Sequence, residues 1–579
     1  MKHMKGEDSV LISYLVYFVH LVLIIIGNAL KKGIRAPDYV IFTLQGDYPD
    51  LRQPPGSFLQ QRLRGRVKSL QELEKDFQAV AKSPQVRGVI LHIGKLDLSL
   101  SQVQSLTQMI NDLQASGKEV IAWATGYYTN SYLLAAAADR ILLQEGGIIY
   151  TLGFTNRALY MKDTLDWCGI EFDVVRISPY KSALDQLTRS DMSGEVREMI
   201  NWLIDSHYRQ FTRSIARGRS LDEEKVQTLI EQTPLSGQKA IDTGAIDGIV
   251  SAEDLPAFLG SGDKPARLAN WDECRKSFPH SLPAAPGKYI AVLRVEGNIV
   301  DGKSQRPPAR PPLPIPFLFN EQTGDLTFVQ QARRVLRDSR AKAVLLYIDS
   351  GGGSASSSEA MASILQKIAA KKPLVALMGS VAGSGGYYVA TPASYLVARP
   401  ATVTGSIGVI SAKIVNSRLL ERLLLNRETI RRGQKDLFGS PEERFTAEER
   451  EKAGEYISQV YQLFVKRVAD SRKMSADAVD QIGGGKVWTG EQALNNGLVD
   501  ELGGLKAALG KLCQLANLPE NTPLVETPYP KRNNAPLPTA AGWIDYTLDN
   551  LAQFREQQAL LAGPLYFHLP PGPGTKLRF

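Results

Sequence analysis

The chain has 579 residues, of which 43% are hydrophobic and 22% are charged, and its formal net charge is +8. These are values of an ordinary globular protein, and they exclude a wholly disordered chain, a collagen and a chain made only of membrane spans. The 3 cysteines cannot organise a disulfide framework. The sequence has no spacing typical of metal ligands and no basic stripe with interleaved aromatic residues. It therefore indicates neither a metal site nor a nucleic-acid partner.

The first element along the chain is an uncharged apolar segment at residues 10–30. A helix of this length spans about 30 Å, the thickness of the hydrocarbon core of a bilayer. The segment is longer than the roughly 7–15 apolar residues of a cleaved signal peptide, although small residues at 27–29 leave that alternative open. We predict a membrane anchor within residues 1–36. Lysine and arginine lie on both sides of the segment, so charge does not decide its orientation.

The remainder of the chain contains one pattern twice. Four segments of the first half recur in the same order in the second half, at offsets of 250 to 255 residues. The pairs are YVIFTLQGDYPD and YIAVLRVEGNIV, RGVILHI and KAVLLYI, KEVIAW and KPLVAL, and LSGQKAIDTGAIDG and WTGEQALNNGLVDE. Collinear matches at so constant an offset indicate a duplication.

Within each copy, short β-branched runs alternate with amphipathic helical segments, which predicts an α/β fold with a mostly parallel sheet. We expect tandem domains at 38–258 and 288–515, a linker at 259–287 and a C-terminal extension at 516–579. The second copy also contains a proline-rich insertion at 304–316, which predicts an exposed loop.

The two copies differ at the turn that follows a buried strand. Residues 349–354 read DSGGGS, whereas the first copy has GKLDLS at 94–99. Glycines at a strand-to-helix turn let backbone N–H groups face a ligand, and the start of the helix adds positive potential. Such a turn can hold an oxyanion, although a tight turn needed only for packing has the same composition.

A second difference is a serine between glycines, Ser384, in the sequence VAGSGGYY. The first copy has YYTNSYL there, so its serine slot falls on Thr129 or Asn130. Small neighbours admit a substrate backbone, and a nucleophilic serine needs a base. None of the six histidines lies in a motif, which leaves a Ser-His-Asp triad open but unsupported. A buried lysine is the alternative, because desolvation penalises its charged form.

Two lysines occupy matching places in the copies, Lys181 in SPYKSA and Lys435 in RGQKD. Each lies 51 or 52 residues after the serine slot of its own copy. A solvated surface position is the ordinary role of a lysine, but the repeat singles out these two. The spacing alone favours neither as the base.

Together, these residues resemble the signal peptide peptidase A type of peptidase family S49, in its long form with two tandem domains. The motifs that carry the resemblance are the N-terminal apolar segment, GSVAGSGGYYVATPA, TVTGSIGV, YKSALDQLTRSDMS and VWTGEQALNNGLVDELGG. The resemblance implies tandem Clp protease/crotonase-like domains and a Ser/Lys dyad. It implies Ser384 as the nucleophile and Lys181 as the base. Lys435 is the alternative base, because this chain retains it in a stretch that resembles the short form.

Further implications concern the surroundings of the dyad. Ser406 is expected to orient the lysine, and Gly352, Gly353 and Gly385 are expected to form the oxyanion hole. Gly351 stands where the family usually has proline, and an oxyanion role for the next two glycines remains feasible. The resemblance implies no cofactor and no metal.

The implied protein is a membrane-anchored endopeptidase that degrades cleaved signal peptides and other unfolded apolar peptides. We expect a homotetramer without a nucleic-acid partner, bound to the lipid bilayer through residues 10–30. The expected location is the cell inner membrane, with the soluble part on the periplasmic side. Two alternatives are a crotonase-like acyl-CoA enzyme and a non-catalytic membrane scaffold whose 304–316 loop recruits partners.

Overall fold

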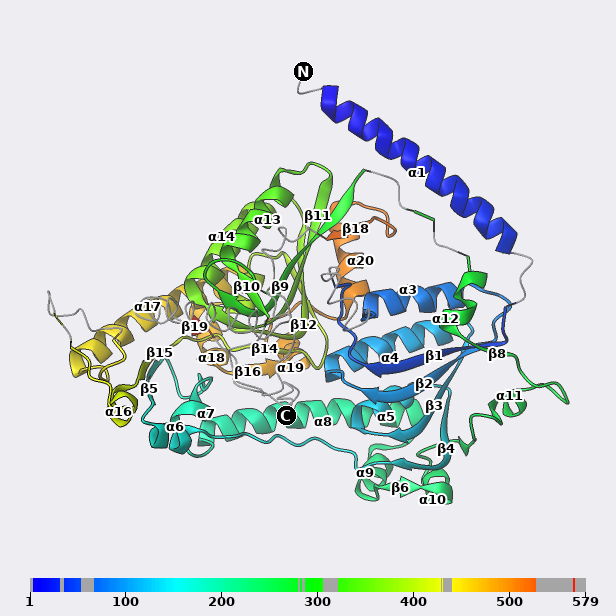
Figure 1. Ribbon diagram of the computed structural model, residues 1–579, viewed down its shortest axis with the longest axis horizontal. Helices are drawn as coiled ribbons and strands as arrows, with labels where there is room; N and C mark the ends of the chain where they lie inside the picture. The colour runs from blue at the N-terminus through cyan, green and yellow to red at the C-terminus, as the bar shows by residue number, and fades with distance from the viewer. Residues whose placement is uncertain are drawn as a thin grey trace. The chain divides into compact units, whose positions relative to one another are not determined.

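The chain forms two compact units in the computed structural model (Figure 1). The first comprises Met1–Phe154, His207–Lys288 and Asn521–Pro523, and the second comprises Thr155–Ser206, Tyr289–Glu520 and Leu524–Phe579. The structure describes residues 4–31, 36–53, 67–279, 282–283, 287–305, 321–428, 430, 440–526 and 566–567. Most of the predicted C-terminal extension and of the proline-rich 304–316 insertion therefore lies outside the described residues.

The first unit contains a sheet whose strand order is β6-β4-β3-β2-β1-β8, with β7 also paired to β4. All its described pairings are parallel except that of β4 with β6. The strands are β1 (Tyr39–Gly46), β2 (Gly88–Leu96), β3 (Glu119–Tyr127), β4 (Arg140–Ile149), β6 (Leu235–Ser236), β7 (Gly248–Ile249) and β8 (Leu268–Asn270).

Helices of the first unit range from 3 to 28 residues in length. They are α1 (Met4–Lys31), α3 (Leu70–Ala81), α4 (Leu100–Ala115), α5 (Thr129–Ala135), α9 (Glu223–Glu231), α10 (Gly237–Asp242), α11 (Leu255–Phe258), α12 (Trp271–Cys274) and the 3₁₀ helix η1 (Arg275–Ser277). Helix α8 (Gly194–Arg219) has residues in both units. Because β8 pairs with β1, part of the predicted linker at 259–287 belongs to this sheet.

The second unit contains a larger sheet, with the order β16-β14-β12-β11-β19-β15-β5 along its main path. The strands are β5 (Glu171–Arg176), β9 (Tyr289–Val300), β10 (Gln322–Gly324), β11 (Ala341–Ser354), β12 (Leu374–Gly383), β13 (Tyr395–Ala398), β14 (Val403–Gly405), β15 (Ile410–Val415), β16 (Val487–Thr489), β17 (Glu501–Leu502), β18 (Leu524–Glu526) and β19 (Tyr566–Phe567). The helices are α6 (Lys162–Cys168), α7 (Asp185–Thr188), α13 (Asp325–Arg337), α14 (Ala355–Ala369), α15 (Gly385–Ala390), α16 (Ser417–Arg422), α17 (Ala447–Arg472), α18 (Ala476–Ile482), α19 (Gly490–Asn495) and α20 (Leu505–Ala516).

Four parallel strands have the same arrangement in each unit. β1, β2, β3 and β4 pair in sequence order in the first, and β9, β11, β12 and β13 pair in sequence order in the second. The α/β class predicted from alternating strands and helices is confirmed. The relation to the Clp protease/crotonase fold stays a prediction.

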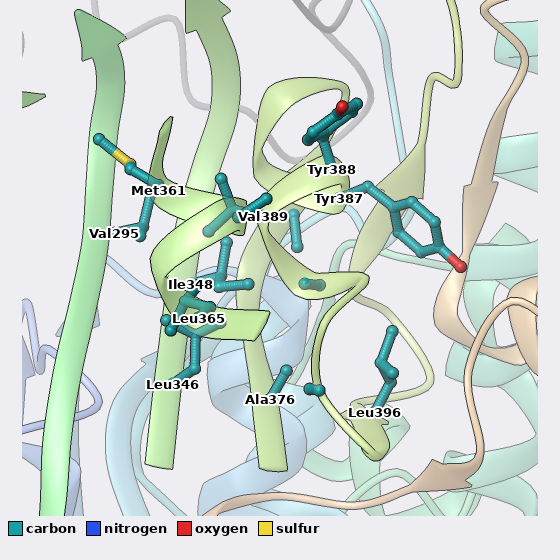
Figure 2. Packing of buried hydrophobic residues seen from close by; sticks show 14 of the residues in the cluster. Val295, Leu346, Ile348, Met361, Leu365, Ala376, Tyr387, Tyr388, Val389 and Leu396 are labelled. Carbon is teal, nitrogen blue, oxygen red and sulfur yellow. The ribbon is translucent and has the colours of Figure 1, made fainter. Parts of the chain in front are cut away.

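The core of the second unit explains why these segments fold as they do. Leu346 and Ile348 of β11 lie beside Leu365 of α14, and Met361 of the same helix lies beside Val295 of β9 (Figure 2). All five side chains are fully buried. The strand is apolar on both faces because both are covered, and the helical residues recur at the spacing of one helix face. Burying each such side chain stabilises the fold by roughly 1.5–3 kcal/mol.

One segment of the first repeat belongs to the second unit. Over its whole length β5 pairs antiparallel with β15, from Glu171 opposite Val415 to Arg176 opposite Ile410. Segment 155–206 therefore packs with residues more than 200 positions later, and the predicted domain at 38–258 is divided between the units. This pairing carries Lys181 into the second unit.

The predicted anchor segment lies in α1. Among the described residues, no helix is long and apolar enough to cross a membrane. The membrane anchor stays a prediction.

Candidate active site

Ser384 occupies the junction between β12 and α15, in a strained backbone conformation with φ of 54° and ψ of −119°. Its N–H donates to the carbonyl oxygen of Gly405 at 2.8 Å, and its own carbonyl accepts from the N–H of Tyr388 at 2.8 Å. A non-glycine residue in such a region costs on the order of 1–3 kcal/mol and persists only when its surroundings fix it. Its side chain is fully buried.

Lys181 lies against this serine. Its Nζ atom is 2.6 Å from Ser384 Oγ and 3.0 Å from both the Oγ and the carbonyl oxygen of Ser406. The whole side chain is buried, and this desolvation lowers the pKa of the Lys181 amine well below its ordinary value. Within the described part of the chain Lys181 makes no ion pair with a carboxylate that would restore its positive charge. The site therefore favours a neutral amine within hydrogen-bond reach of a hydroxyl.

A glycine-rich loop at residues 483–485 packs against the turn that contains Ser178 and Lys181, here called the lysine turn. The hydroxyl of Ser178 donates to the carbonyl oxygen of Gly484. Gly485 has a φ of 93°, and a Cβ atom there would lie 2.7 Å from the Cα atom of Lys181. Its N–H donates to the carbonyl oxygen of Ile407 at 2.7 Å. The loop thus contacts both the lysine turn and the segment between β14 and β15 that follows Ser406.

Sequence reasoning missed this loop. Its signal was the run Gly483–Gly485 just before the repeated motif, which has no glycine counterpart before LSGQKAIDTGAIDG in the first copy. Glycine is required at position 485 because the lysine backbone leaves no room for a side chain.

Ser406 also has a left-handed backbone, with φ of 53°, and its N–H donates to the carbonyl oxygen of Lys486 at 2.7 Å. Its fully buried hydroxyl is one of the three oxygen atoms around Lys181 Nζ. A hydroxyl there can accept from or donate to the amine, so it can fix the direction of the nitrogen lone pair.

The three glycines predicted for an oxyanion hole lie together. A Cβ atom on Gly385 would be 3.2 Å from the N atom of Gly353 and 3.3 Å from the Cα atom of Gly352. Gly353 also approaches β9 so closely that a Cβ atom would meet the carbonyl oxygen of Ile299 at 2.0 Å. The N–H of Gly352 already donates to Ser350 Oγ at 3.1 Å. Gly353 and Gly385 are therefore better placed than Gly352 to donate to a ligand.

The sequence offered two other candidates for the base, Lys435 and a histidine. Lys435 lies outside the described residues. The second unit has no histidine among its described residues, so nothing there could complete a Ser-His-Asp triad. In the described ranges no cluster of three or more metal-ligating side chains could hold a metal ion.

A strained serine, a buried lysine with a lowered pKa and a pair of nearby glycine N–H groups are the parts that a serine peptidase of the Ser/Lys kind requires. Comparison with known proteins gives the same class. The model of peptidase family S49 matches residues 112–261 and 366–519, which together make up more than half of the chain. The chain belongs to peptidase family S49 and is a serine protease.

Relatives match along most of the chain. "Serine protease SPPA, chloroplastic" from Arabidopsis thaliana is 31% identical over 83% of this chain and 72% of its own length. "Protease 4" from Haemophilus influenzae is 29% identical over 77% of this chain and 72% of its own length. "Protease 4" from Salmonella typhi is 28% identical over 87% of this chain and 83% of its own length. These matches favour the protease over the acyl-CoA enzyme and the scaffold.

Proposed function

We propose that this protein is a membrane-anchored endopeptidase in which Ser384 is the nucleophile and Lys181 is the general base. Its substrates are cleaved signal peptides and other unfolded apolar peptides. The observation that carries the proposal is the 2.6 Å distance between Lys181 Nζ and Ser384 Oγ in a fully buried setting. That distance is within the range over which a base takes a proton directly.

In the proposed reaction the neutral amine of Lys181 accepts the proton of the Ser384 hydroxyl as Oγ attacks a peptide carbonyl. The N–H groups of Gly353 and Gly385 donate to the oxyanion that forms on the carbonyl oxygen. The ammonium group then gives its proton to the leaving amine, and the peptide bond breaks. Water hydrolyses the acyl-enzyme, with the same lysine as the base. Ser406 orients the lysine amine throughout.

The pH dependence follows from the base. Burial lowers the pKa of Lys181. The amine is neutral and can act as a base above that lowered pKa, and it becomes protonated and inactive as the pH falls below it. The value of kcat/KM should therefore rise with pH and level off well below the pH at which an exposed lysine titrates, about 10.4. A rate that does not change with pH over this range would contradict a lysine base.

The test compares the full chain with three substitutions in the hydrolysis of a fluorogenic apolar peptide. Ser384→Ala and Lys181→Ala should each lower kcat/KM by at least about 10³-fold, because nucleophile and base act as a unit. Lys435→Ala should retain most of the activity. Loss with Lys435→Ala and retention with Lys181→Ala would assign the base to Lys435 instead. A fluorophosphonate should label the full chain but not Ser384→Ala.

Cellular placement is part of the same proposal. Residues 10–30 anchor a homotetramer in the cell inner membrane, with the soluble part on the periplasmic side, where cleaved signal peptides are near. The uncharged apolar run of these residues supports the anchor. Detergent should extract the protein from membranes and carbonate should not. Release by carbonate would contradict an anchor, and a reporter fused at the C-terminus tests the orientation.

A further inference from the structure

Lys181 lies on a segment that belongs to no helix and no strand. Residues 177–184 connect β5, which ends at Arg176, to α7, which begins at Asp185 (Figure 1). Within the segment, the N–H of Lys181 donates to the carbonyl oxygen of Ser178 at 3.1 Å, which closes one turn. A segment without the repeated hydrogen bonds of a helix or a strand opens more easily than the elements around it. Its long side chain therefore needs further contacts to keep one position.

An ion pair joins the two residues that flank this segment. The Nη1 atom of Arg176 is 2.6 Å from Oδ1 of Asp185. The backbone of Arg176 is fixed in the sheet, where it lies opposite Ile410 in the pairing of β5 with β15. Asp185 is buried, with 4% of its surface exposed. The ion pair therefore ties the far end of the segment back to the sheet and closes a loop that contains Lys181.

Stability alone does not explain why the Asp185 carboxylate is buried. Burial raises the pKa of Asp185, and the guanidinium of Arg176 only opposes that shift. The Oδ2 atom of Asp185 is buried and has no hydrogen-bond partner in the part of the chain that the structure describes. A buried ion pair contributes little net stability compared with apolar side chains, but it can specify one arrangement of the groups around it. Here the arrangement that it specifies is that of the segment with the proposed base.

We propose that the ion pair of Arg176 and Asp185 positions Lys181, by holding its segment closed so that the amine stays buried beside Ser384. This inference rests on the proposed function for the role of Lys181. The Nζ atom of Lys181 is 2.6 Å from Ser384 Oγ, and a displacement of about 1 Å at such a site can cost about 10²-fold in rate. An open segment would also let water reach the amine, which would then hold its proton more tightly. Arg176 and Asp185 are thus positioning residues that act through the lysine.

The first test is Asp185→Asn in the full chain, which keeps the shape of the side chain and removes its charge. We expect kcat for an apolar peptide to fall about 10²-fold and KM to stay within about twofold. The midpoint of the pH profile should rise by about one pH unit, because the Lys181 amine becomes hydrated. Loss of a negative charge near a lysine would by itself lower the midpoint, so the direction separates positioning from direct electrostatics. An unchanged kcat, or a midpoint that falls or stays the same, would overturn the proposal.

Few groups other than the lysine could move that midpoint. Burial alone shifts the pKa of Lys181, and the hydroxyls around its Nζ atom do not titrate in this range. The charged or titratable groups around Asp185 include Tyr160, Arg176, Arg189 and Glu195. Arginine keeps its charge, glutamate titrates near about pH 4.3, and burial raises the pKa of the tyrosine above its ordinary value of about 10. A midpoint between about pH 6 and 10 therefore reports the lysine.

Two further variants keep the test decisive. Asp185→Glu retains the carboxylate and should bring the midpoint back and restore most of kcat. The matched control is Asp247→Asn, which breaks the ion pair of Asp247 with Arg219 in the first unit, where the closest atoms are 2.7 Å apart. It should lower Tm and leave both kcat and the midpoint unchanged. A midpoint that rises equally in Asp247→Asn would mean that any loss of stability has this effect, and it would overturn the positioning role.

A double-mutant cycle tests whether the two residues act as a pair. Arg176→Gln, Asp185→Asn and the double variant should lose the same factor in kcat, because each breaks the same ion pair. Losses that multiply would show independent roles and contradict the proposal. If Asp185→Asn does not fold, Arg176→Gln changes the more exposed partner and carries the same expectations. Full activity of Lys181→Ala would defeat the proposed function, whereas an inactive Lys181→Ala with a fully active Asp185→Asn would defeat only the positioning role.

Discussion

The two strand-to-helix turns after β3 and β12 have the same scaffold and different chemistry. Tyr132 of α5 and Tyr387 of α15 are both fully buried, and their hydroxyls donate to the carbonyl oxygens of Ala245 at 2.9 Å and Leu498 at 2.7 Å. Each carbonyl belongs to the repeated motif of its own copy. The duplication has thus kept the tyrosine that fixes the helix.

The residue before the helix is where the copies diverge. Tyr128 precedes α5 with a relaxed φ of −106°, whereas Ser384 precedes α15 with a φ of 54°. In the first copy the two positions that can correspond to Ser384 carry side chains that donate hydrogen bonds to backbone carbonyls. Thr129 Oγ1 donates to Gly153 at 3.2 Å, and Asn130 Nδ2 donates to Leu98 at 2.8 Å. Of the two residues that precede these helices, only Ser384 has a strained backbone, as expected where strain serves a site rather than the fold.

The preceding turn differs in the same way. In the first copy Ser99 starts α4 with a capping box shared with Gln102, an ordinary helix start. In the second copy the turn contains Gly352 and Gly353, with φ of 107° and 155°. Ser354 also caps α14 by accepting from the N–H of Ser357 at 3.3 Å, so the copies differ not in the cap but in the two residues before it. We propose that these residues serve catalysis only in the second copy.

The largest expected effect that sharpens this comparison comes from Gly385→Ala. The new Cβ atom would lie 2.6 Å from Ser358 Oγ and 3.2 Å from the N atom of Gly353, so the oxyanion glycines must move apart. We expect kcat to fall about 10²–10³-fold, the usual cost of losing one oxyanion donor. The control is Gly454→Ala in α17, where no atom lies within 4 Å of the new Cβ position. Unchanged kcat in Gly385→Ala would remove Gly385 from the site.

The substitutions Ser406→Ala and Ser406→Gly distinguish the contribution of the Ser406 hydroxyl from that of its backbone conformation. Both remove the oxygen 3.0 Å from Lys181 Nζ, but only glycine adopts the φ of 53° without strain. Loss of one hydrogen bond worth about 1.4 kcal/mol should lower kcat about tenfold in both variants, with a shifted pH profile. If Ser406→Gly keeps full activity while Ser406→Ala loses it, the backbone rather than the hydroxyl matters.

Lys181→Met should abolish hydrolysis yet raise stability at neutral pH. Burial lowers the pKa of Lys181 in the folded chain. Between that lowered pKa and about pH 10.4, the unfolded chain binds a proton that the folded chain does not, so the buried lysine lowers the free energy of unfolding. We expect Tm to rise by about 2–4 °C at pH 7, which corresponds to about 1 kcal/mol. The gain should shrink as the pH approaches 10.4.

Lys118 of the first unit is the matched control. It is also a buried lysine with a pKa lowered by desolvation, but its Nζ atom donates to the carbonyl oxygens of Ser83 at 2.6 Å and Val86 at 2.7 Å. Lys118→Met leaves two carbonyls without their donor, whereas Lys181→Met leaves only that of Ser406, so Lys118→Met should lower Tm. Thermal unfolding followed by circular dichroism measures both variants. A lower Tm in Lys181→Met would contradict the expectation that burial of the Lys181 amine destabilises the folded chain.

The smallest effect on hydrolysis is expected at Thr129, a position of the first copy that corresponds to Ser384. Thr129→Ala should leave kcat/KM within about twofold and cost about 1 kcal/mol of stability, the usual worth of one hydrogen bond. Peptide hydrolysis and thermal unfolding test the two statements separately. A loss of activity above about tenfold would mean that the first copy contributes to catalysis beyond Lys181.

The sequence by itself determined the periodic features of this protein. Buried apolar runs such as 344–348 and the helical spacing in 357–370 indicated β11 and α14, because periodicity reports which faces are covered. The repeat indicated the shared strand order. The difference between the copies singled out Ser384, and the matching lysine positions limited the bases to Lys181 and Lys435. Nothing in the pattern stated which lysine would meet the serine.

Only the tertiary structure decided the partners. The pairing of β5 with β15 brings Lys181 to Ser384 across 203 positions of the chain. Three further contacts also depended on the tertiary structure. They are the contact of Gly485 with the lysine turn, the hydrogen bond from the Gly352 N–H to Ser350 Oγ, and the pairing of β19 with Gly353. Periodicity shows which faces of a segment are buried, but it does not show which distant segment packs against them. That choice depends on strand register and backbone conformation, which are set only when the whole sheet forms.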